Sequence, residues 1–281
     1  MNAPDLSRVE TARAVARRFK VSPQHSLGQN FLVDDGVRQR IVASLGVDSG
    51  PLLEIGCGLG ALSQALLAKG WPLTGLELDE SCVAALRLLQ AEHPDFRVIH
   101  MDALSADPVQ LGFSGRYSVV ANLPYQITGA ILPHLLRWDP APLACHLVVQ
   151  REVARRLAAP LGDWSLATLS LRMAAEVESV FDIAPESFWP QPKVHSSLVV
   201  VRPHGGSQRN QEEGILKLAR PIFQQRRKQL HHGLANSLGV GAGRAAQLLV
   251  EAGLDPSRRP GTLSPLEWRD LWDVVSRDPV G

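Results

Sequence analysis

Two patterns of apolar and polar residues alternate along the first part of the chain. Short apolar runs that end in a charged or amide residue predict β-strands, and segments with apolar residues every three or four positions predict helices. The predicted strands are 51–56, 72–79, 97–102, 117–122 and 146–150, with helices at 60–70, 80–92, 127–137 and 151–159 between and after them. This alternation predicts an α/β fold, a parallel sheet with helices on both faces.

Other segments add to this predicted sheet and its helices. Helical periodicity predicts a basic amphipathic helix over 5–20 and another helix over 34–46, and two β-like runs at 176–183 and 197–202 are expected to pair at one edge of the sheet. The pattern changes near residue 204. "HGGSQRNQEEG" has the composition of a linker, and residues 212–276 show only helical periodicity. We therefore predict two domains, an α/β domain over 1–204 and a small all-helical domain over 205–281.

Composition narrows the class of protein. Hydrophobic residues make up 45% and charged residues 20% of the 281 residues, which is typical of a soluble globular protein. The net charge of +1 does not by itself indicate a nucleic-acid partner. No apolar run reaches the roughly 18 residues of a membrane span, and the N-terminus lacks the apolar core of a secretory signal. The three cysteines are far apart, so we expect no metal site, no disulfide framework and a cytoplasmic location.

A glycine-rich loop follows the first of these strands. In "LLEIGCGLGALSQAL", Gly56, Gly58 and Gly60 lie between a strand and a helix, where the backbone can bend sharply and approach a ligand. Gly56, Gly58 and Ala61 also satisfy the dinucleotide-binding pattern, so an NAD site stays open here. With Glu54, however, the loop reads E-x-G-x-G-x-G. This pattern resembles motif I of the Rossmann-like methyltransferases, whose loop wraps the amino-acid part of S-adenosylmethionine.

Acidic residues end the next two strands. Glu77 could accept hydrogen bonds from both hydroxyls of a ribose, and Asp102 could accept one from the amino group of adenine. The alternative is that both residues only cap the helices that follow. NAD and S-adenosylmethionine both carry an adenosine, so this pair of carboxylates does not distinguish between them.

The end of the fourth strand does distinguish between them. "VVANLPYQIT" places Asn122, Leu123, Pro124 and Tyr125 at the rim where the other candidate residues gather. A carboxamide oxygen and a backbone carbonyl could accept both N–H groups of a purine amine. Pro124 restricts Leu123 to an extended conformation, and Tyr125 could stack on the base. The alternative is a helix entry, with Asn122 as a cap and Tyr125 as packing.

Several segments together resemble one family. "SLGQNFL", "LEIGCGLG", "LELD", "MDAL", "ANLPYQI", "FWPQPKVHSS" and "FQQRRKQL" occur in the order found in ribosomal RNA adenine dimethyltransferases of the KsgA/RsmA family. The resemblance runs from about residue 20 to residue 275. It implies an S-adenosylmethionine-dependent dimethylation of N6 of two adjacent adenines near the 3′ end of 16S rRNA, linked to small-subunit biogenesis. It also implies a methyltransferase domain over 1–204 and an RNA-binding helical domain over 205–281.

The resemblance also implies roles for individual residues. The cofactor would be contacted by Asn30, Leu32, Gly56, Gly58, Glu77, Asp102 and Asn122. The target base would meet Asn122, Leu123, Pro124, Tyr125 and Phe188. For Phe188, before a proline-rich loop, an ordinary core position is an equal alternative. RNA phosphates would be bound by Arg17 and Arg18 in the N-terminal helix and by Arg226, Arg227 and Lys228.

The chain departs from the family pattern at three places: Leu27 in "SLGQNFL", Thr128–Gly129–Ala130 after "NLPYQI", and "DWSLATLS" at 163–170. These departures affect the expected shape of the target pocket, and none removes a predicted cofactor contact. Two further alternatives share the scaffold. One is a resistance-type dimethylase of large-subunit rRNA, and the other is a non-catalytic RNA-binding assembly factor. We expect a monomer.

Overall fold

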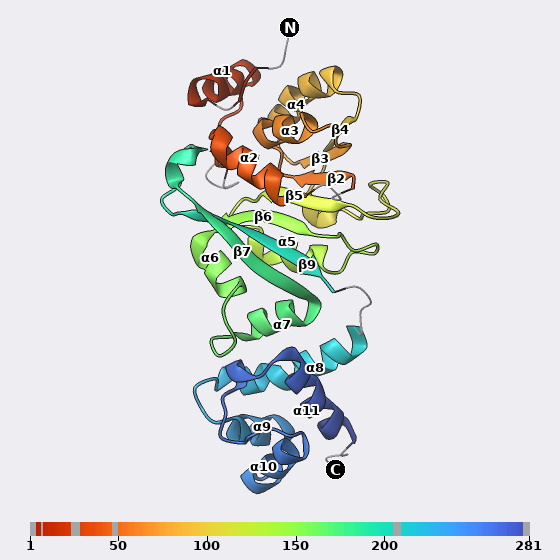
Figure 1. Cartoon of the computed structure of the whole chain (residues 1–281), viewed down its shortest axis with the longest axis vertical. Helices are drawn as coiled ribbons and strands as arrows, with labels where there is room; N and C mark the ends of the chain where they lie inside the picture. Colours follow the sequence, from red (N-terminus) through yellow and green to blue (C-terminus); the bar gives the residue numbers. More distant parts are fainter. Residues whose placement is uncertain (1–3, 7, 24–28, 47–49, 205–208, 278–281) are drawn as a thin grey trace. The chain divides into compact units, whose positions relative to one another are not determined.

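The computed structural model describes residues 4–6, 8–23, 29–46, 50–204 and 209–277. The chain divides into two compact units (Figure 1). The first, here called the sheet unit, comprises the described residues up to Ala154 together with Val177–Pro203. The second, the helical unit, comprises Arg155–Glu176 and the described residues from His204 onward. Leu27 and residues 205–208 of the predicted linker lie outside the described residues.

The sheet unit is built on seven strands in the order β4-β3-β2-β5-β6-β9-β7. Their bounds are β2 Leu52–Ile55, β3 Leu73–Glu77, β4 Phe96–His100, β5 Ser118–Asn122, β6 Cys145–Gln150, β7 Ala175–Ile183 and β9 Ser196–Pro203. β2 to β6 are parallel, as predicted, and β9 is antiparallel to β6. The sheet is therefore mixed rather than wholly parallel. The predicted edge pair of β-like runs is confirmed as β9 and β7.

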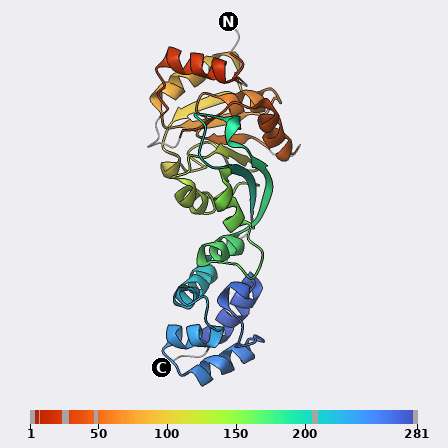
Figure 2. The ribbon, with the colours of Figure 1, turned by 90° about the vertical axis from the view of Figure 1, so that its left-hand side faces the viewer.

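Helices cover both faces of this sheet. α2 (Asp35–Ser44), α3 (Ala61–Leu67) and α4 (Glu80–Glu92) bury apolar side chains in one core cluster with β2, β3 and β5. α5 (Thr128–Leu135) lies on the opposite face from α2, as both views show (Figures 1 and 2). α1 (Val9–Phe19) packs on α4 through a second cluster, and α6 (Arg151–Leu157) follows β6. This arrangement leaves the carboxyl ends of the parallel strands at one rim.

A small antiparallel sheet was not predicted. β1 (Phe31–Leu32) pairs with β8 (Phe188–Trp189), so that Leu32 lies opposite Phe188. A strand of two residues has no period that a sequence pattern could reveal. The pairing fixes the path of residues 29–33 beside the glycine loop. It is supported by Ser187, whose carbonyl accepts from the amide of Val33 at 2.9 Å.

The helical unit has its own core around Trp268. Its helices are α7 (Leu166–Ala174), α8 (Arg209–Gln224), α9 (Leu230–Leu238), α10 (Ala242–Glu251) and α11 (Pro265–Arg277). Two predictions need correction. α8 already begins at Arg209, so most of the predicted linker is helix, since "NQEEG" continues the amphipathic pattern of the helix. Residues 155–176 belong to this unit rather than to the first domain, because Trp164, Leu169 and Met173 pack into its core.

Within the described ranges, no helix combines the length and the apolar character needed to cross a membrane. The same residues contain no group of three or more His, Cys, Asp or Glu side chains that could hold a metal ion.

Candidate active site

The predicted rim of the sheet contains a pocket of about 190 Å³ within the sheet unit. It is formed where the glycine loop follows β2, where β3, β4 and β5 end, and where the segment before β1 passes over them. Its walls are residues 29–31, Ile55, Gly56, Gly58, 76–78, 101–104 and 122–127. Six of the seven predicted cofactor positions therefore line one cavity, together with Leu123, Pro124 and Tyr125.

The glycine loop requires glycine for two separate reasons. Gly56, Gly58 and Gly60 have φ values of 72°, 55° and 93°, in the left-handed region that side chains disfavour. At Gly58 there is also no room, because a Cβ atom would lie 2.8 Å from the ring of Phe31. The loop thus turns from β2 into α3 with its backbone exposed to the pocket, and Phe31 lies close against it.

Glu77 organises this loop from the end of β3. Its carboxylate accepts from the amides of Gly58 (2.7 Å), Leu78 (2.8 Å) and Asp79 (2.9 Å). Glu77 is buried, and burial raises the pKa of its carboxyl group, while these three hydrogen bonds oppose the rise. Two carboxylate oxygens have about four acceptor sites, so one remains for a ligand hydroxyl at the pocket.

Asp102 caps a short helix and also lines the pocket, so the structure confirms the capping interpretation and leaves the ligand contact a prediction. Its carboxylate accepts from the amide of Leu104 at 2.9 Å and so caps η2 (Ala103–Ser105). The residue is nevertheless exposed, and it lines the pocket between Met101 and the partly exposed Leu104. A cap that takes one lone pair leaves the rest of the carboxylate available to a donor on a bound ring.

Glu54 lies beneath the loop rather than in the pocket. It is only 1% exposed, and its carboxyl group accepts from the hydroxyl of Ser63 at 2.6 Å. Burial raises its pKa to about 8, because the charged form cannot be solvated there. The Cys57 thiol lies against the backbone carbonyls of Glu54 and Leu76, at 3.8 and 3.7 Å. Glu54 thus supports the loop from inside the strand.

Asn122 reaches the pocket from the end of β5. Its amide nitrogen donates to the backbone carbonyl of Asn30 at 2.8 Å. With the nitrogen engaged in this way, the oxygen is the part of the carboxamide that can accept from a ligand. The contact joins residues 92 positions apart in the chain, and it explains how the segment before β1 orients the side chain.

The residues after Asn122 complete one wall. Leu123 is buried, and its amide donates to the carbonyl of Val148 in β6 at 3.2 Å, which fixes the backbone there. Tyr125 is half-buried, with its hydroxyl 2.8 Å from the hydroxyl of Ser196. Burial raises the pKa of this phenol, so it stays neutral at ordinary pH.

Two predicted site residues are not in the pocket. Leu32 and Phe188 are each 3% exposed, and they lie opposite one another in the β1–β8 pair as part of the core. The position of Phe188 favours its interpretation as a core residue. Instead, Phe31 lines the pocket, and sequence reasoning missed it although it stands between Asn30 and Leu32. Sequence reasoning also missed Gln29, whose amide donates to Asp79 at 3.0 Å.

The predicted RNA-binding residues are exposed, and they lie in both units. Arg17 and Arg18 lie at the C-terminal end of α1 in the sheet unit. Arg226, Arg227 and Lys228 lie in the turn between α8 and α9, called the basic turn below, in the helical unit. We had predicted a helix for this segment. The turn forms because α8 ends at Gln224 and α9 begins only at Leu230.

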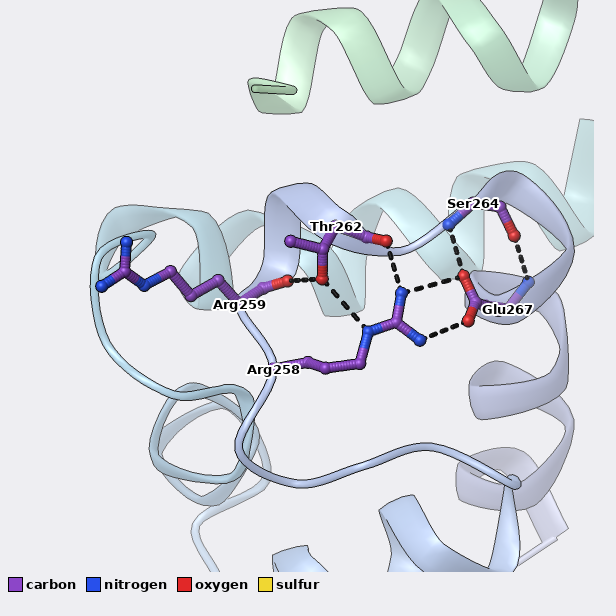
Figure 3. A network of polar contacts seen from close by, with 5 residues as sticks. All are labelled: Arg258, Arg259, Thr262, Ser264 and Glu267. Atoms are coloured by element: carbon purple, nitrogen blue, oxygen red, sulfur yellow. Dashed lines mark hydrogen bonds and ion pairs between the residues drawn. The ribbon is translucent and has the colours of Figure 1, made fainter. Parts of the chain in front are cut away.

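A polar network supports the helix that follows the basic turn. Arg258 donates to both carboxylate oxygens of Glu267 and to the hydroxyl and carbonyl of Thr262 (Figure 3). Glu267 also accepts from the amide of Ser264 at 2.8 Å, which forms a capping box at the start of α11. The hydrogen bonds from Arg258 lower the pKa of Glu267 to about 2. The carbonyl of Arg258 accepts from Leu230, the first residue of α9, at 2.7 Å.

The sheet, the glycine loop and the acidic strand ends define a Rossmann-like class I methyltransferase fold. Solved structures of this shape include the 23S rRNA methyltransferase ErmE, with a TM-score of 0.72, 26% identity and coverage of 88% of this chain and 100% of that one. A dimethyladenosine transferase from Plasmodium falciparum has a TM-score of 0.73, 24% identity, and coverage of 86% and 95%.

Sequence comparison identifies the family. The model of the family described as ribosomal RNA adenine dimethylase matches residues 21–274. Ribosomal RNA small subunit methyltransferase A of Dehalococcoides mccartyi is 36% identical over 274 residues, 95% of this chain and 94% of that protein. The protein of the same name from Rhodopseudomonas palustris is 38% identical over 260 residues, with 90% and 89% covered. The chain belongs to the ribosomal RNA adenine dimethylase family, which confirms the resemblance and decides against an NAD-dependent oxidoreductase.

Proposed function

We propose that this adenine dimethyltransferase acts on N6 of two adjacent adenines near the 3′ end of 16S rRNA, with S-adenosylmethionine as the methyl donor, during small-subunit biogenesis. The observation that carries the proposal is the carboxamide of Asn122. It stands at the rim of the pocket beside Glu77 and Asp102, and the bond to Asn30 commits its nitrogen so that its oxygen is the acceptor.

The residues of the pocket fit an adenosine-bearing cofactor. The backbone of Gly56 and Gly58 lines the pocket, Glu77 can accept from a ribose hydroxyl, and Asp102 can accept from an exocyclic amine. When bound, S-adenosylmethionine supplies a methyl group on a sulfonium, an electrophile with a good leaving group. The protein therefore needs neither a metal nor a strong base, and its contribution is alignment.

The target amine needs help because its lone pair is delocalised into the purine ring. Asn122 can accept one N–H, and the carbonyl of Leu123, fixed by Pro124, can accept the second. Such contacts draw the nitrogen toward tetrahedral geometry. Tyr125 would stack on the base, a contact worth about 1–3 kcal/mol per base. The nitrogen must lie about 3–3.5 Å from the methyl carbon for an in-line transfer, and the proton then leaves to solvent.

Exposed basic residues would bind the RNA backbone. In the sheet unit these residues are Arg17 and Arg18, and in the helical unit they are those of the basic turn. Phosphate contacts require positive charge and little fixed geometry, which is consistent with their exposure. We retain the predictions of a monomer and of a cytoplasmic location, where ribosomal subunits are assembled.

The assignment of the small ribosomal subunit as the target rests on the sequence relatives. The structure of ErmE, named for 23S rRNA, shares 26% identity with this chain. The relatives named for the small subunit share 36–38% over nearly the whole chain, which favours the 16S target. A non-catalytic assembly factor would not need Glu77, Asp102 and Asn122 together at one pocket.

Primer extension tests this proposal, because reverse transcriptase stops at dimethyladenine. The rRNA of a strain that lacks the gene should show no stop near the 3′ end of 16S rRNA, and the gene on a plasmid should restore it. A stop that persists without the gene would overturn the 16S assignment. A gene-dependent stop in 23S rRNA would favour the resistance-type enzyme instead.

A further inference from the structure

Tyr125 is anchored through its hydroxyl by a residue outside the pocket. The 2.8 Å contact with Ser196 joins the segment after β5 to the first residue of β9, 71 positions later in the chain. The side chain of Ser196 is fully buried, so water cannot replace its partner. The loss of either hydroxyl would leave the other without that hydrogen bond.

The anchor belongs to a rigid part of the sheet. Ser196 pairs with Gln150 of β6 in the antiparallel register, and the preceding carbonyl, of His195, accepts from the amide of Arg151 at 2.9 Å. The tyrosine ring is only half-buried and lines the pocket. Packing therefore holds one side of the ring, and the hydroxyl contact holds its far end.

We infer that Ser196 is a positioning residue for the target base. It holds the ring of Tyr125 at the angle at which a stacked adenine presents its amine to the Asn122 carboxamide. Ser196 does not line the pocket and acts through Tyr125. The inference rests on the proposed function.

The inference predicts an asymmetry between the two methyl transfers to one adenine. An unmethylated amine has two N–H groups, and their hydrogen bonds to Asn122 and Leu123 help to fix its orientation. A monomethyl amine has only one N–H group, so its orientation depends more on stacking against Tyr125. The loss of the Ser196 anchor should therefore slow the second transfer more than the first, and monomethyladenine should accumulate.

Single-turnover methylation of small subunits isolated from the deletion strain would test this. Ser196→Ala and Tyr125→Phe should each lower the rate constant of the second transfer about 10-fold, the equivalent of a hydrogen bond of about 1.4 kcal/mol, and that of the first by less. The double variant should be no slower than either single variant, since both remove the same hydrogen bond. The affinity for S-adenosylmethionine should be unchanged.

The neighbouring serine provides a matched control. Ser197 is equally buried, and its hydroxyl donates to Asp182 at 2.6 Å, away from Tyr125. Ser197→Ala removes the hydrogen bond of an equally buried serine hydroxyl, so it should cost stability without changing the ratio of monomethyl to dimethyl product. Equal ratios in Ser196→Ala and Ser197→Ala would show that Ser196 has only a structural role.

The chain has only two tyrosines, which permits a measurement that does not depend on activity. In protein labelled with 3-fluorotyrosine, fluorine NMR should give one resonance for Tyr125 and one for Tyr117, whose hydroxyl donates to the carbonyl of Pro140 at 2.8 Å. Tyr117→Phe assigns the two. Ser196→Ala should shift or broaden the Tyr125 resonance and leave that of Tyr117 unchanged.

The outcomes separate the two proposals. If the wild-type enzyme methylates the subunits and Ser196→Ala matches it in product ratio and in fluorine spectrum, the inference fails and the proposed function stands. If the wild-type enzyme leaves these adenines unmodified, the proposed function fails, and the role of Ser196 in adenine positioning fails with it. If Ser196→Ala does not fold, the product ratio of Tyr125→Phe alone decides whether the inference holds.

Discussion

The pocket rim and the basic turn present their polar side chains in different ways. At the rim, hydrogen bonds within the chain hold three polar side chains: Glu77 by three backbone amides, Asn122 by Asn30, and Tyr125 by Ser196. The basic turn instead presents exposed, long side chains on a connection between two helices. A methyl transfer needs atoms at fixed positions, whereas attraction to a phosphate backbone needs local charge.

The comparison predicts that changes at the rim reduce function strongly, while changes at the turn have a smaller effect. The sharpest test is Asn122→Ala. It removes the acceptor and releases Asn30, and we expect the rate constant of methyl transfer to fall roughly 100- to 1000-fold, as when a preorganised hydrogen-bonding group is removed. The first transfer should suffer at least as much as the second. Quench-flow measurement of product checks this, with the exposed Asn236→Ala as control.

The substitution Glu77→Gln should have the next largest effect on function. An amide placed among three backbone donors can accept with only one of its two ends, so the loop and the ribose contact are both disturbed. We expect the affinity for S-adenosylmethionine, measured by calorimetry, to fall about 10- to 100-fold. Glu80→Gln, an exposed residue three positions further on, changes the charge equally. A similar loss in both variants would mean that charge, rather than geometry, matters at the rim.

Neutralising the basic turn should have a smaller and salt-dependent effect. Replacing Arg226, Arg227 and Lys228 by Ala should reduce the slope of log affinity for the small subunit against log salt by about one for each residue that binds a phosphate. The methylation rate at saturating subunit should change little, because the rim is intact. Filter binding at several salt concentrations checks this, with exposed Lys69→Ala as a single-charge reference. An unchanged slope would contradict RNA binding at the turn.

Glu54 gives a prediction about stability and pH. Its folded-state pKa is raised to about 8 by burial, so between about pH 4.5 and 8 the folded state holds a proton that the unfolded state has lost. Stability should therefore decrease as pH rises through this range. Glu54→Gln removes this pH-dependent contribution. As pH rises through this range, the free energy of unfolding of the variant should therefore increase relative to that of the wild type by at least about 1.4 kcal/mol, the equivalent of one pKa unit.

Urea unfolding at pH 5, 6, 7 and 8 measures this difference, and Glu152→Gln on the exposed face of α6 serves as control. The raised pKa of Glu77 acts in the same direction, but it is present in both proteins and cancels in the difference. A gap between Glu54→Gln and wild type that stays constant with pH would show that Glu54 is ionised in the folded state.

Local sequence was sufficient for the architecture of the rim. The succession of strands β2 to β5 along the chain, the glycine loop and the acidic strand ends follow from period, turn residues and the rule that ligands gather at the carboxyl ends of parallel strands. These features depend on residues close together in the chain, where the side-chain pattern directly reflects which face is buried. The NLPY segment and the family resemblance were visible for the same reason.

Tertiary structure decided which neighbouring residue faces the pocket. Phe31 lines it while Leu32 enters the core opposite Phe188, and only the register of two two-residue strands fixes that choice. The bonds Asn122–Asn30 and Tyr125–Ser196 likewise span 92 and 71 positions. No local pattern carries these contacts, because they depend on how distant segments are brought together by the sheet. The sequence determined which groups stand at the rim, and the packing determined which of their atoms a ligand can meet.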